Sequence, residues 1–301
     1  MIGATGFVGR ALVPVLARRG EVVAVSRAGA AADVPGVRTR AADVTQSLRG
    51  VLDGVDVAYH LVHSLGARGF VDLDRRAAEN VAAEAERAGV AQIVYLGGLG
   101  DDQADLSDHL RSRMETAAVL GSGAVPVTTL RAAVIVGRGS AAFETIVALV
   151  DRLPVMIAPR WLSTPTQPIA LEDVIHYLDG VAGRREALGQ GFDVGGPEIL
   201  TYGDMIKRIA RIRGRRPLIL EVPVLTPRLS SYWLHLVTPV RATVTRPLIE
   251  GLRNPTVAHD DRIRRLLPSS LTRFSDAARR ALDEDAAHPA LERRRRLEEA
   301  S

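Results

Sequence analysis

The fold is decided at the start of the chain, which opens with Met1-Ile2-Gly3-Ala4-Thr5-Gly6-Phe7-Val8-Gly9-Arg10. Three glycines stand three residues apart in this stretch. Apolar residues at helical spacing follow them as far as Leu16, and Gly20 is placed to end the helix. The valine-rich run Glu21–Arg27 then predicts a buried strand. A glycine turn, a helix and a parallel strand are the second half of a βαβ unit.

The three glycines have the spacing that a dinucleotide-binding turn needs. Gly3 permits a tight turn, Gly6 lets a pyrophosphate approach the backbone, and Gly9 lets the helix pack closely on the sheet. The start of the helix then offers unpaired N–H groups to the phosphates. A purely structural glycine turn is the alternative. We therefore expect a dinucleotide to bind along this turn, at Gly3, Thr5, Gly6, Phe7, Val8 and Gly9.

Arg27 bears on which dinucleotide binds. It follows the second strand, where an acidic residue would hold the ribose 2′-hydroxyl of NAD and an arginine suits the 2′-phosphate of NADP. The sequence therefore favours NADP, with NAD as the second choice. The alternative is a solvated arginine, since the chain contains many of them.

The glycine turn should follow a strand, but only Met1 and Ile2 precede it. We expect that truncated first strand to lie in the middle of the sheet. This suggests the hypothesis that Met1 is an internal start and that the natural protein begins several residues earlier. Mass spectrometry of the native N-terminus tests the hypothesis.

Strands and helices alternate after this unit. The predicted strands are Val37–Val44, Val55–Val62, Gln92–Leu96 and Val127–Arg131, and the predicted helices are Thr45–Leu52, Phe70–Ala88 and Ser107–Leu120. This order is typical of an α/β protein with a Rossmann-type, doubly wound parallel sheet. Ligands of such sheets bind beyond the carboxyl ends of the strands. The remaining candidate dinucleotide contacts belong to that edge: Arg27, Asp43, Val44, Leu61, Val62, His63 and Gly97.

The alternation loosens after Gly139, where prolines divide the chain into loops. We expect a dinucleotide-binding domain at residues 1–153, a small C-terminal α/β cap at 154–282 with segments that return to the core, and a charged tail at 283–301. The apolar segment Tyr232–Leu252 is interrupted by prolines and arginines. It is therefore too broken to span a bilayer, and we expect it to form helices that close the cap.

The composition is that of an ordinary globular protein, with 47% apolar and 25% charged residues. The net charge of +4 comes from arginines spread along the chain, so nucleic-acid binding is not expected. The chain has no cysteine, which excludes disulfides and thiol catalysis and fits a cytoplasmic protein. The histidines lack metal-ligand spacing, so no metal site is expected.

Several motifs resemble those of extended or atypical short-chain dehydrogenases/reductases: Gly3–Gly9, Tyr95-Leu96-Gly97-Gly98-Leu99 and Arg131–Gly137. Others are similar to the YbjT-like branch, which is grouped with NmrA-like regulators and an accessory subunit of respiratory complex I: Leu61–Ser64, Ser107–Arg113, Gly139–Glu144 and Pro168–Glu172. The resemblance spans nearly the whole chain. It implies NAD(P) binding, and the superfamily position implies that Asp43 accepts from the adenine amino group, with a turn-forming aspartate as the alternative.

Typical members of that superfamily use a tyrosine as acid/base and a lysine four residues later, which lowers the tyrosine pKa and holds the nicotinamide ribose. This chain has one lysine, Lys207, and no tyrosine is followed by lysine at that spacing. In the register of the resemblance, His109 replaces the tyrosine and Arg113 the lysine. Gly97 and Gly98 stand where the usual serine would be. His109 is therefore either a substitute acid with Arg113 on the ribose, or a residue without a catalytic role.

Two functions fit these observations. The first is an NADP(H)-dependent oxidoreductase with a non-standard active site, acting on a small carbonyl or quinone-like substrate under the cap. The second is a non-catalytic NADP(H)-sensing regulator or accessory subunit. The missing tyrosine–lysine pair favours the second, and the intact dinucleotide crevice fits both. The substrate, the protein partner and the oligomeric state cannot be read from the sequence.

Overall fold

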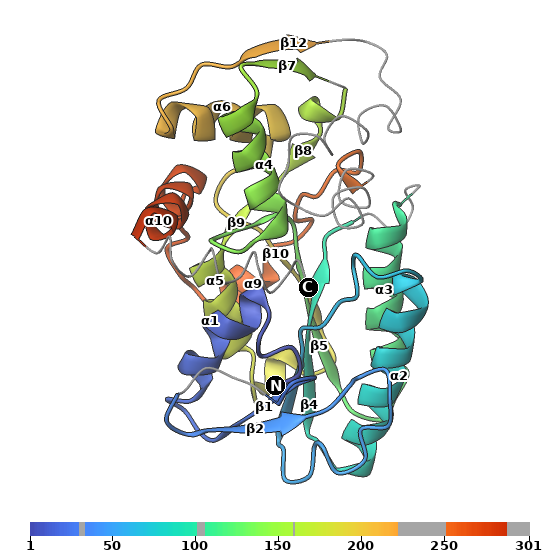
Figure 1. Ribbon diagram of the computed structural model, residues 1–301. Helices are drawn as coiled ribbons and strands as arrows, with labels where there is room; N and C mark the ends of the chain where they lie inside the picture. Colours follow the sequence, from blue (N-terminus) through green and yellow to red (C-terminus); the bar gives the residue numbers. More distant parts are fainter. Residues whose placement is uncertain (30–33, 101–105, 159, 222–250, 288–301) are drawn as a thin grey trace.

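The computed structural model describes residues 1–29, 34–100, 106–158, 160–221 and 251–287. Most of the segment Tyr232–Leu252, which the sequence analysis assigned to the cap, lies outside these residues, as does the end of the predicted tail. The described chain forms a lower layer around a parallel sheet and an upper layer that covers one end of this sheet (Figure 1).

The main sheet is parallel throughout, as the alternating pattern predicted. Its strands are β1 (Val22–Ser26), β2 (Val37–Ala41), β3 (Val57–His60), β4 (Gln92–Gly98), β5 (Val127–Ala132) and β10 (Gly191–Val194). Strand β2 pairs with β1. A second group of strands pairs in the order β3, β4, β5 and β10. The inner strands, such as β4, are mostly buried on both faces and are rich in apolar residues, whereas β2 at the edge of the sheet is largely exposed.

Met1 and Ile2 fill the gap between β1 and β3. Ile2 bridges in parallel to Val25 on one side and to His60 on the other. Its N–H donates to the Tyr59 carbonyl at 2.9 Å, and the Val25 N–H donates to the Met1 carbonyl at 2.8 Å. The truncated first strand therefore lies in the middle of the sheet, as predicted, and it places the glycine turn directly at the carboxyl edge.

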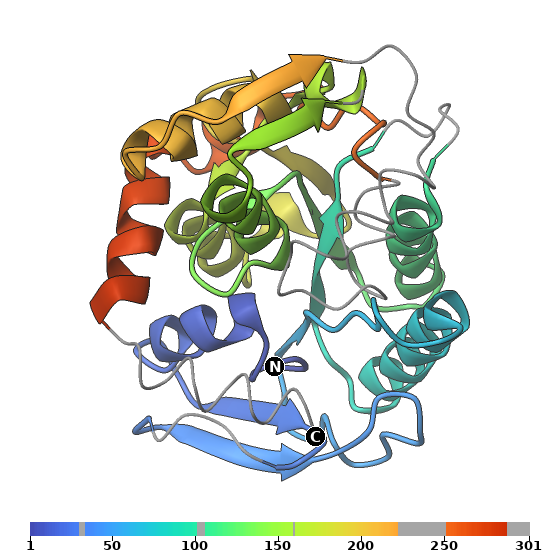
Figure 2. The same cartoon turned by 45° about the horizontal axis from the view of Figure 1, so that its top comes forward.

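Helices cover both faces of this sheet, which Figures 1 and 2 show nearly edge-on. Helices α1 (Phe7–Leu16) and α5 (Leu171–Gly180) lie on one face, and α2 (Phe70–Arg87) and α3 (Asp108–Gly121) lie on the other. Helix α2 buries a stripe at helical spacing that includes Ala77, Ala78, Val81 and Ala85. Ala78, Val81 and Ala85 share an apolar cluster with strand residues such as Ala58 and Ile93.

The predicted helix Thr45–Leu52 is wrong, because this segment consists of turns. Gly50 has a φ of +81°, a left-handed conformation that interrupts helical hydrogen bonding. The segment is anchored instead by buried Leu48 and Leu52 and by the Glu84 carboxylate, which accepts from the Leu52 N–H at 3.2 Å.

The upper layer, here called the cap, has its own apolar core. Its helices are α4 (Ala141–Arg152), α6 (Tyr202–Ile212) and α10 (Phe274–Ala287). Three short strand pairs accompany them: β6 (Ile135–Val136) with β9 (Ile169–Ala170), β7 (Val155–Ala158) with β12 (Leu218–Glu221), and β8 (Pro165–Thr166) with β11 (Leu200–Thr201). Helix α6 begins with a complete capping box between Thr201 and Asp204.

Elements from each of the two larger predicted ranges contribute to both layers. Helix α4 packs with the cap although the sequence analysis placed it in residues 1–153. Strand β10 and helix α5 return to the lower layer from within residues 154–282. Helix α10 continues to Ala287, and so includes the first residues of the predicted tail. The short helix α9 (Arg262–Leu266) packs beside β10.

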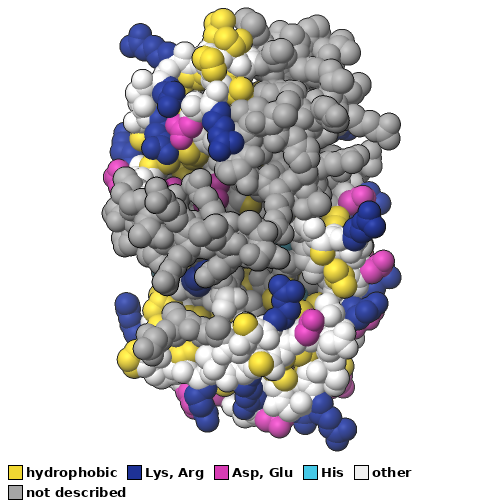
Figure 3. Space-filling view, viewed as in Figure 1, with side chains coloured by type: hydrophobic (Ala, Val, Ile, Leu, Met, Phe, Trp, Pro, Cys, Tyr) yellow, Lys and Arg dark blue, Asp and Glu magenta, His cyan; other side chains and the backbone are white. Residues whose placement is uncertain are grey.

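The surface carries both signs of charge. On the face seen in Figure 3, basic side chains are scattered among acidic ones and form no single block. Many described arginines make ion pairs, such as Arg19 with Asp179 at 2.8 Å. Among the helices of the described chain, none combines the length and apolar character that crossing a membrane requires.

Candidate functional site

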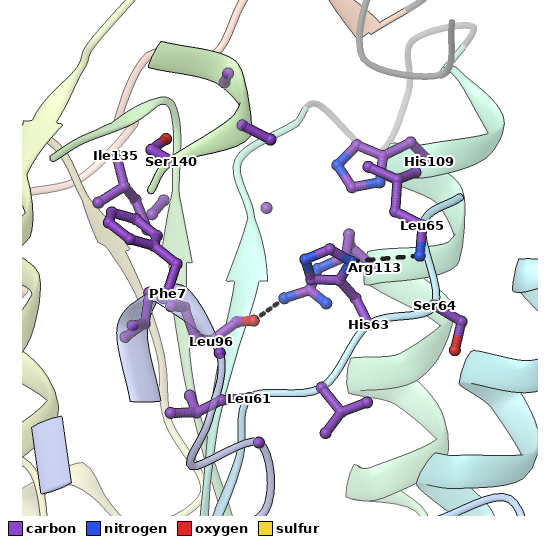
Figure 4. A pocket seen from close by; sticks show the side chains of 18 of the residues that line it. Phe7, Leu61, His63, Ser64, Leu65, Leu96, His109, Arg113, Ile135 and Ser140 are labelled. Carbon is purple, nitrogen blue, oxygen red and sulfur yellow. Dashed lines mark hydrogen bonds between the residues drawn. The ribbon is translucent and has the colours of Figure 1, made fainter. Parts of the chain in front are cut away.

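A cavity of about 950 Å³ lies between the carboxyl ends of the strands and the cap. Every site residue named from the sequence lines it: Gly3, Thr5, Gly6, Phe7, Val8, Gly9, Arg27, Asp43, Val44, Leu61, Val62, His63, Gly97, His109 and Arg113. In Figure 4, Phe7, Ile135 and Ser140 stand on one side of the space, with His63, Leu65 and His109 on the other. The structure thus brings together residues from the turn, four strand ends and helix α3.

The glycine turn has a geometry that side chains would disrupt. Gly3 has a φ of +87°, and a Cβ on Gly9 would come within 2.1 Å of the Gly3 carbonyl oxygen. The Gly6 N–H donates to the same oxygen at 3.1 Å. Helix α1 begins with neither a side-chain cap nor an acidic residue in its first turn. Its N-terminal N–H groups therefore suit an anionic ligand such as a pyrophosphate.

Arg27 and Asp43 lie at the ends of β1 and β2. The Arg27 side chain is exposed at the rim of the cavity. Asp43 Oδ1 accepts from the N–H and the hydroxyl of Thr45, at 2.9 and 2.8 Å. These hydrogen bonds, together with the nearby Arg27 charge, lower the pKa of Asp43. Asp43 therefore does form the turn that was considered as the alternative to adenine binding. Both hydrogen bonds of this turn use Oδ1, and neither uses Oδ2.

Arg113 is held at the centre of the cavity wall. Its side chain is 9% exposed, its guanidinium lies over the Tyr95 ring at 5.0 Å from the centroid, and Nη2 donates to the Leu96 carbonyl. The Tyr95 hydroxyl donates to the Arg113 carbonyl at 3.0 Å, which fixes the helix against the strand. Arg113 Nη1 is buried and has no hydrogen-bond partner among the described residues. A ligand with an acceptor oxygen fits this donor.

Three histidines surround this cation. His60 is fully enclosed, and burial together with Arg113 lowers its pKa to about 3. Half-buried His109 and exposed His63 line the cavity, where desolvation by the surrounding protein and the Arg113 charge lower the pKa of both below the usual value. Uncharged imidazoles are the result at neutral pH. A neutral His109 has no imidazolium proton to donate, which weighs against a role as the substitute acid.

The imidazole of His63 has a defined orientation. Its Nδ1 accepts from the Leu65 N–H at 3.4 Å, so the proton of the neutral ring lies on Nε2. Figure 4 shows this contact beside the guanidinium of Arg113. His63 can therefore act as a hydrogen-bond donor in the cavity.

Asp74 is a site residue that the sequence analysis missed. It lies on α2, is 5% exposed, and accepts from the Ser64 N–H at 2.6 Å and from the Ser112 hydroxyl at 3.1 Å. It thereby joins the loop that carries His63 to the helix that carries Arg113. The sequence could have indicated Asp74, because it is a carboxylate within the apolar stripe of α2.

The cap side of the cavity was also missed, because its residues come from distant segments without a motif. They are Ser140, Thr145, Ile146, Leu149, Tyr202, Ile206, Leu252 and Thr256. None of these side chains carries a charge. The segment that contains Thr256 is held to the cap by a 2.7 Å hydrogen bond between Thr256 and Thr166. It is held to the start of α3 by Asn254, whose side-chain oxygen accepts from the Ser107 N–H at 3.4 Å.

No cluster of three or more histidine or carboxylate side chains suited to a metal ion occurs within the described ranges. The expectation that the site holds no metal is not tested by this observation.

Comparison with known proteins identifies the lower layer. Residues 3–134 match the family model described as NAD(P)H-binding. A comparison with curated protein sequences found no significant match.

Solved structures share the fold of the whole chain. An NADPH-dependent quinone oxidoreductase from Escherichia coli, solved with NADPH, superposes with a TM-score of 0.73 at 18% identity, over 92% of this chain and 97% of that one. An epimerase from Methanothermobacter thermautotrophicus superposes with a TM-score of 0.73 at 16% identity, over 97% and 93%. A UDP-glucuronic acid 4-epimerase from Bacillus cereus, solved with its ligand and NAD, gives 0.69 at 14% identity, over 94% and 96%.

These findings agree with the motifs. Residues 3–134 match an NAD(P)H-binding domain, and the chain as a whole shares its fold with these solved structures.

Proposed function

We propose that this protein binds NADP(H) in the cavity and acts as an oxidoreductase on a small, uncharged carbonyl or quinone-like substrate held under the cap. The observation that carries the proposal is the continuity of one cavity from the glycine turn to the cap. The cavity of about 950 Å³ is lined both by residues of the sheet edge and by residues of the cap, so a substrate under the cap would lie in the same space as the dinucleotide. When bound, the cofactor would supply or accept a hydride.

Different lining residues would bind different parts of the cofactor. The start of α1 faces the pyrophosphate, Arg27 the 2′-phosphate, and Asp43 with Val44 the adenine. Leu61, Val62, His63 and Gly97 would form the wall along the nicotinamide half. Arg113 would donate a hydrogen bond to the nicotinamide half as well. The superfamily resemblance implies that the ribose is the acceptor.

The uncharged lining of the cap supports the choice of substrate. A nucleotide-sugar would bring a second pyrophosphate under the cap, and the described cap-side residues offer it no arginine or lysine. Burying unpaired phosphate charges is unfavourable. We therefore favour an uncharged acceptor over a sugar nucleotide.

A non-catalytic NADP(H) sensor is the second candidate. The specific observation in its favour is the neutral His109 in place of the usual acid. A sensor would bind NADPH and NADP with different affinities and would not consume NADPH with any acceptor.

Titration calorimetry on Arg27→Ala tests the cofactor. Loss of a charge-assisted contact to the 2′-phosphate should weaken NADPH binding about tenfold or more and leave NADH binding unchanged. Arg18→Ala, an exposed arginine outside the cavity, is the matched control. Equal affinity of the Arg27 variant and the wild type for NADPH would contradict the NADP assignment.

Turnover separates the two functions. NADPH oxidation should be followed with a naphthoquinone, an aromatic aldehyde and UDP-glucose. Oxidation with either of the first two supports the oxidoreductase. Tight NADPH binding without oxidation by any acceptor supports the sensor.

A further inference from the structure

In the described part of the cavity, a fixed cation, Arg113, stands among side chains that are poor acids. Nη1 of Arg113 is a buried donor with no partner, in a side chain held by Tyr95 and by the Leu96 carbonyl. No carboxylate forms an ion pair with this guanidinium among the described residues. No described carboxylate neutralises this positive charge, and the contacts with Tyr95 and Leu96 hold the guanidinium in place.

The side chains around this cation are poor acids. The Tyr95 hydroxyl already donates to the Arg113 carbonyl and is fully buried. His60, His63 and His109 are neutral for the reasons given above. Tyr202 lies on the cap side, where its hydroxyl shares hydrogen bonds with Thr166 and Thr256, and burial raises its pKa to about 12.

We propose that Arg113 Nη1 binds the substrate oxygen that becomes negatively charged on reduction, and that the substrate is therefore a quinone rather than an unconjugated aldehyde or ketone. This inference rests on the proposed oxidoreductase function and names the substrate class of the same site. It also gives Arg113 a catalytic role, beyond the contact to the ribose that the resemblance implies.

The chemistry of the two acceptor classes differs at the oxygen. A quinone accepts the hydride with its electron pair, and the nicotinamide is oxidised. One quinone oxygen then carries the negative charge until water supplies a proton to complete the hydroquinone. That oxyanion resembles a phenolate, whose conjugate acid has a pKa of about 10. An unconjugated ketone would form an alkoxide about as basic as hydroxide, since the pKa of bulk water is about 15.7, and would need an acid at once.

A phenol whose ionisation is visible tests the oxyanion site directly. 4-Nitrophenol would be titrated with pH by absorbance, bound to the full-length protein in the presence of saturating NADP. An unpaired guanidinium at hydrogen-bond distance should lower the apparent pKa of the bound phenol by about one unit or more, which is at least a tenfold preference for the phenolate. The charged and titratable neighbours to be considered are His60, His63, His109, Tyr95 and Asp74.

Two variants test whether Arg113 causes the lowered pKa of the bound phenol. Arg113→Gln should abolish the preference for the phenolate, and Arg111→Gln, an exposed arginine on the same helix, should retain it. Calorimetry with NADP reports whether each variant still binds cofactor. If Arg113→Gln does not fold, the titration of the wild-type protein and of Arg113→Lys, which keeps the charge, still decides the question.

The outcomes are distinct. A bound phenol with an unshifted or raised pKa overturns the proposal, as does NADP binding without any phenol binding. If Arg113→Gln weakens NADP binding but leaves the phenol pKa lowered, the arginine serves the ribose only and the oxyanion role is wrong. If NADP does not bind at all, the proposed function itself fails. In turnover, a naphthoquinone should be reduced and a cyclic ketone of similar size should not, and the reverse order would also overturn the proposal.

Discussion

At the scale of single residues, the site depends on positions where a single atom decides which side chain or ligand can be accommodated. Gly9 has no room for a Cβ because the Gly3 carbonyl occupies that space. Nη1 of Arg113 has no hydrogen-bond partner in the described part of the protein. Such positions were visible in the sequence as residue types, but the sequence could not show whether their atoms would meet.

Gly9→Ala should weaken both the fold and cofactor binding. The added methyl group would lie 2.1 Å from the Gly3 oxygen, so the turn must shift, at a cost of about 1–3 kcal/mol. Gly20→Ala is the control, since its Cβ would meet no atom within 4 Å. Urea unfolding and NADPH titration measure the two effects. Equal stability of the two variants would show that the turn is not as tight as described.

Acidification should destabilise the protein through His60. Its pKa is about 3 in the folded protein and about 6.5 when unfolded, so the unfolded chain binds more protons in between. Stability is therefore full above about pH 6.5 and falls by up to about 1.4 kcal/mol per pH unit for this group as the pH drops. His60→Gln should reduce the slope measured by urea unfolding between pH 6.5 and 4.5.

At the scale of secondary-structure elements, the site is assembled by contacts between the loop after β3, helix α2 and helix α3. The carboxylate of Asp74 makes this connection from the buried face of α2. Helix α3 begins where predicted, since Ser107 caps it by accepting from the Leu110 N–H. Local signals of this kind were readable from the sequence, as was the strand–turn–helix unit at the N-terminus.

Replacement of Asp74 tests this connection. Asp74→Ala leaves the Ser64 N–H and the Ser112 hydroxyl without their acceptor, so we expect a loss of about 2–4 kcal/mol and weaker NADPH binding. Asp74→Asn keeps one acceptor oxygen for Ser64 and should lose less of both. Chemical unfolding and calorimetry measure these changes. If the two variants behave alike, the tie between the loop and the helices is not what positions the site.

At the scale of the whole molecule, the cavity exists because two layers meet. The sequence predicted the sheet edge well, because the glycine turn and the strand ends are local patterns. It did not predict the cap wall, whose residues around Ser140, Tyr202 and Thr256 converge from distant segments and have no characteristic spacing. The predicted helix Thr45–Leu52 was wrong because a left-handed glycine and long-range anchors override local helical preference.

Because both layers line the cavity, a bound cofactor should stabilise the entire fold. NADPH at a hundredfold its dissociation constant should raise the free energy of unfolding by about 2.7 kcal/mol, since only the folded state binds it. Thermal unfolding with increasing NADPH measures this effect. A melting temperature that does not depend on NADPH would indicate that the cavity does not hold the cofactor.

The most direct test of the central claim is a calorimetric titration of the folded, full-length chain with NADPH and with NADH. The account predicts saturable binding of NADPH at one site per chain, tighter than that of NADH by about tenfold or more because of Arg27. Saturable binding of neither nucleotide to a protein whose circular dichroism shows an intact α/β fold would contradict it.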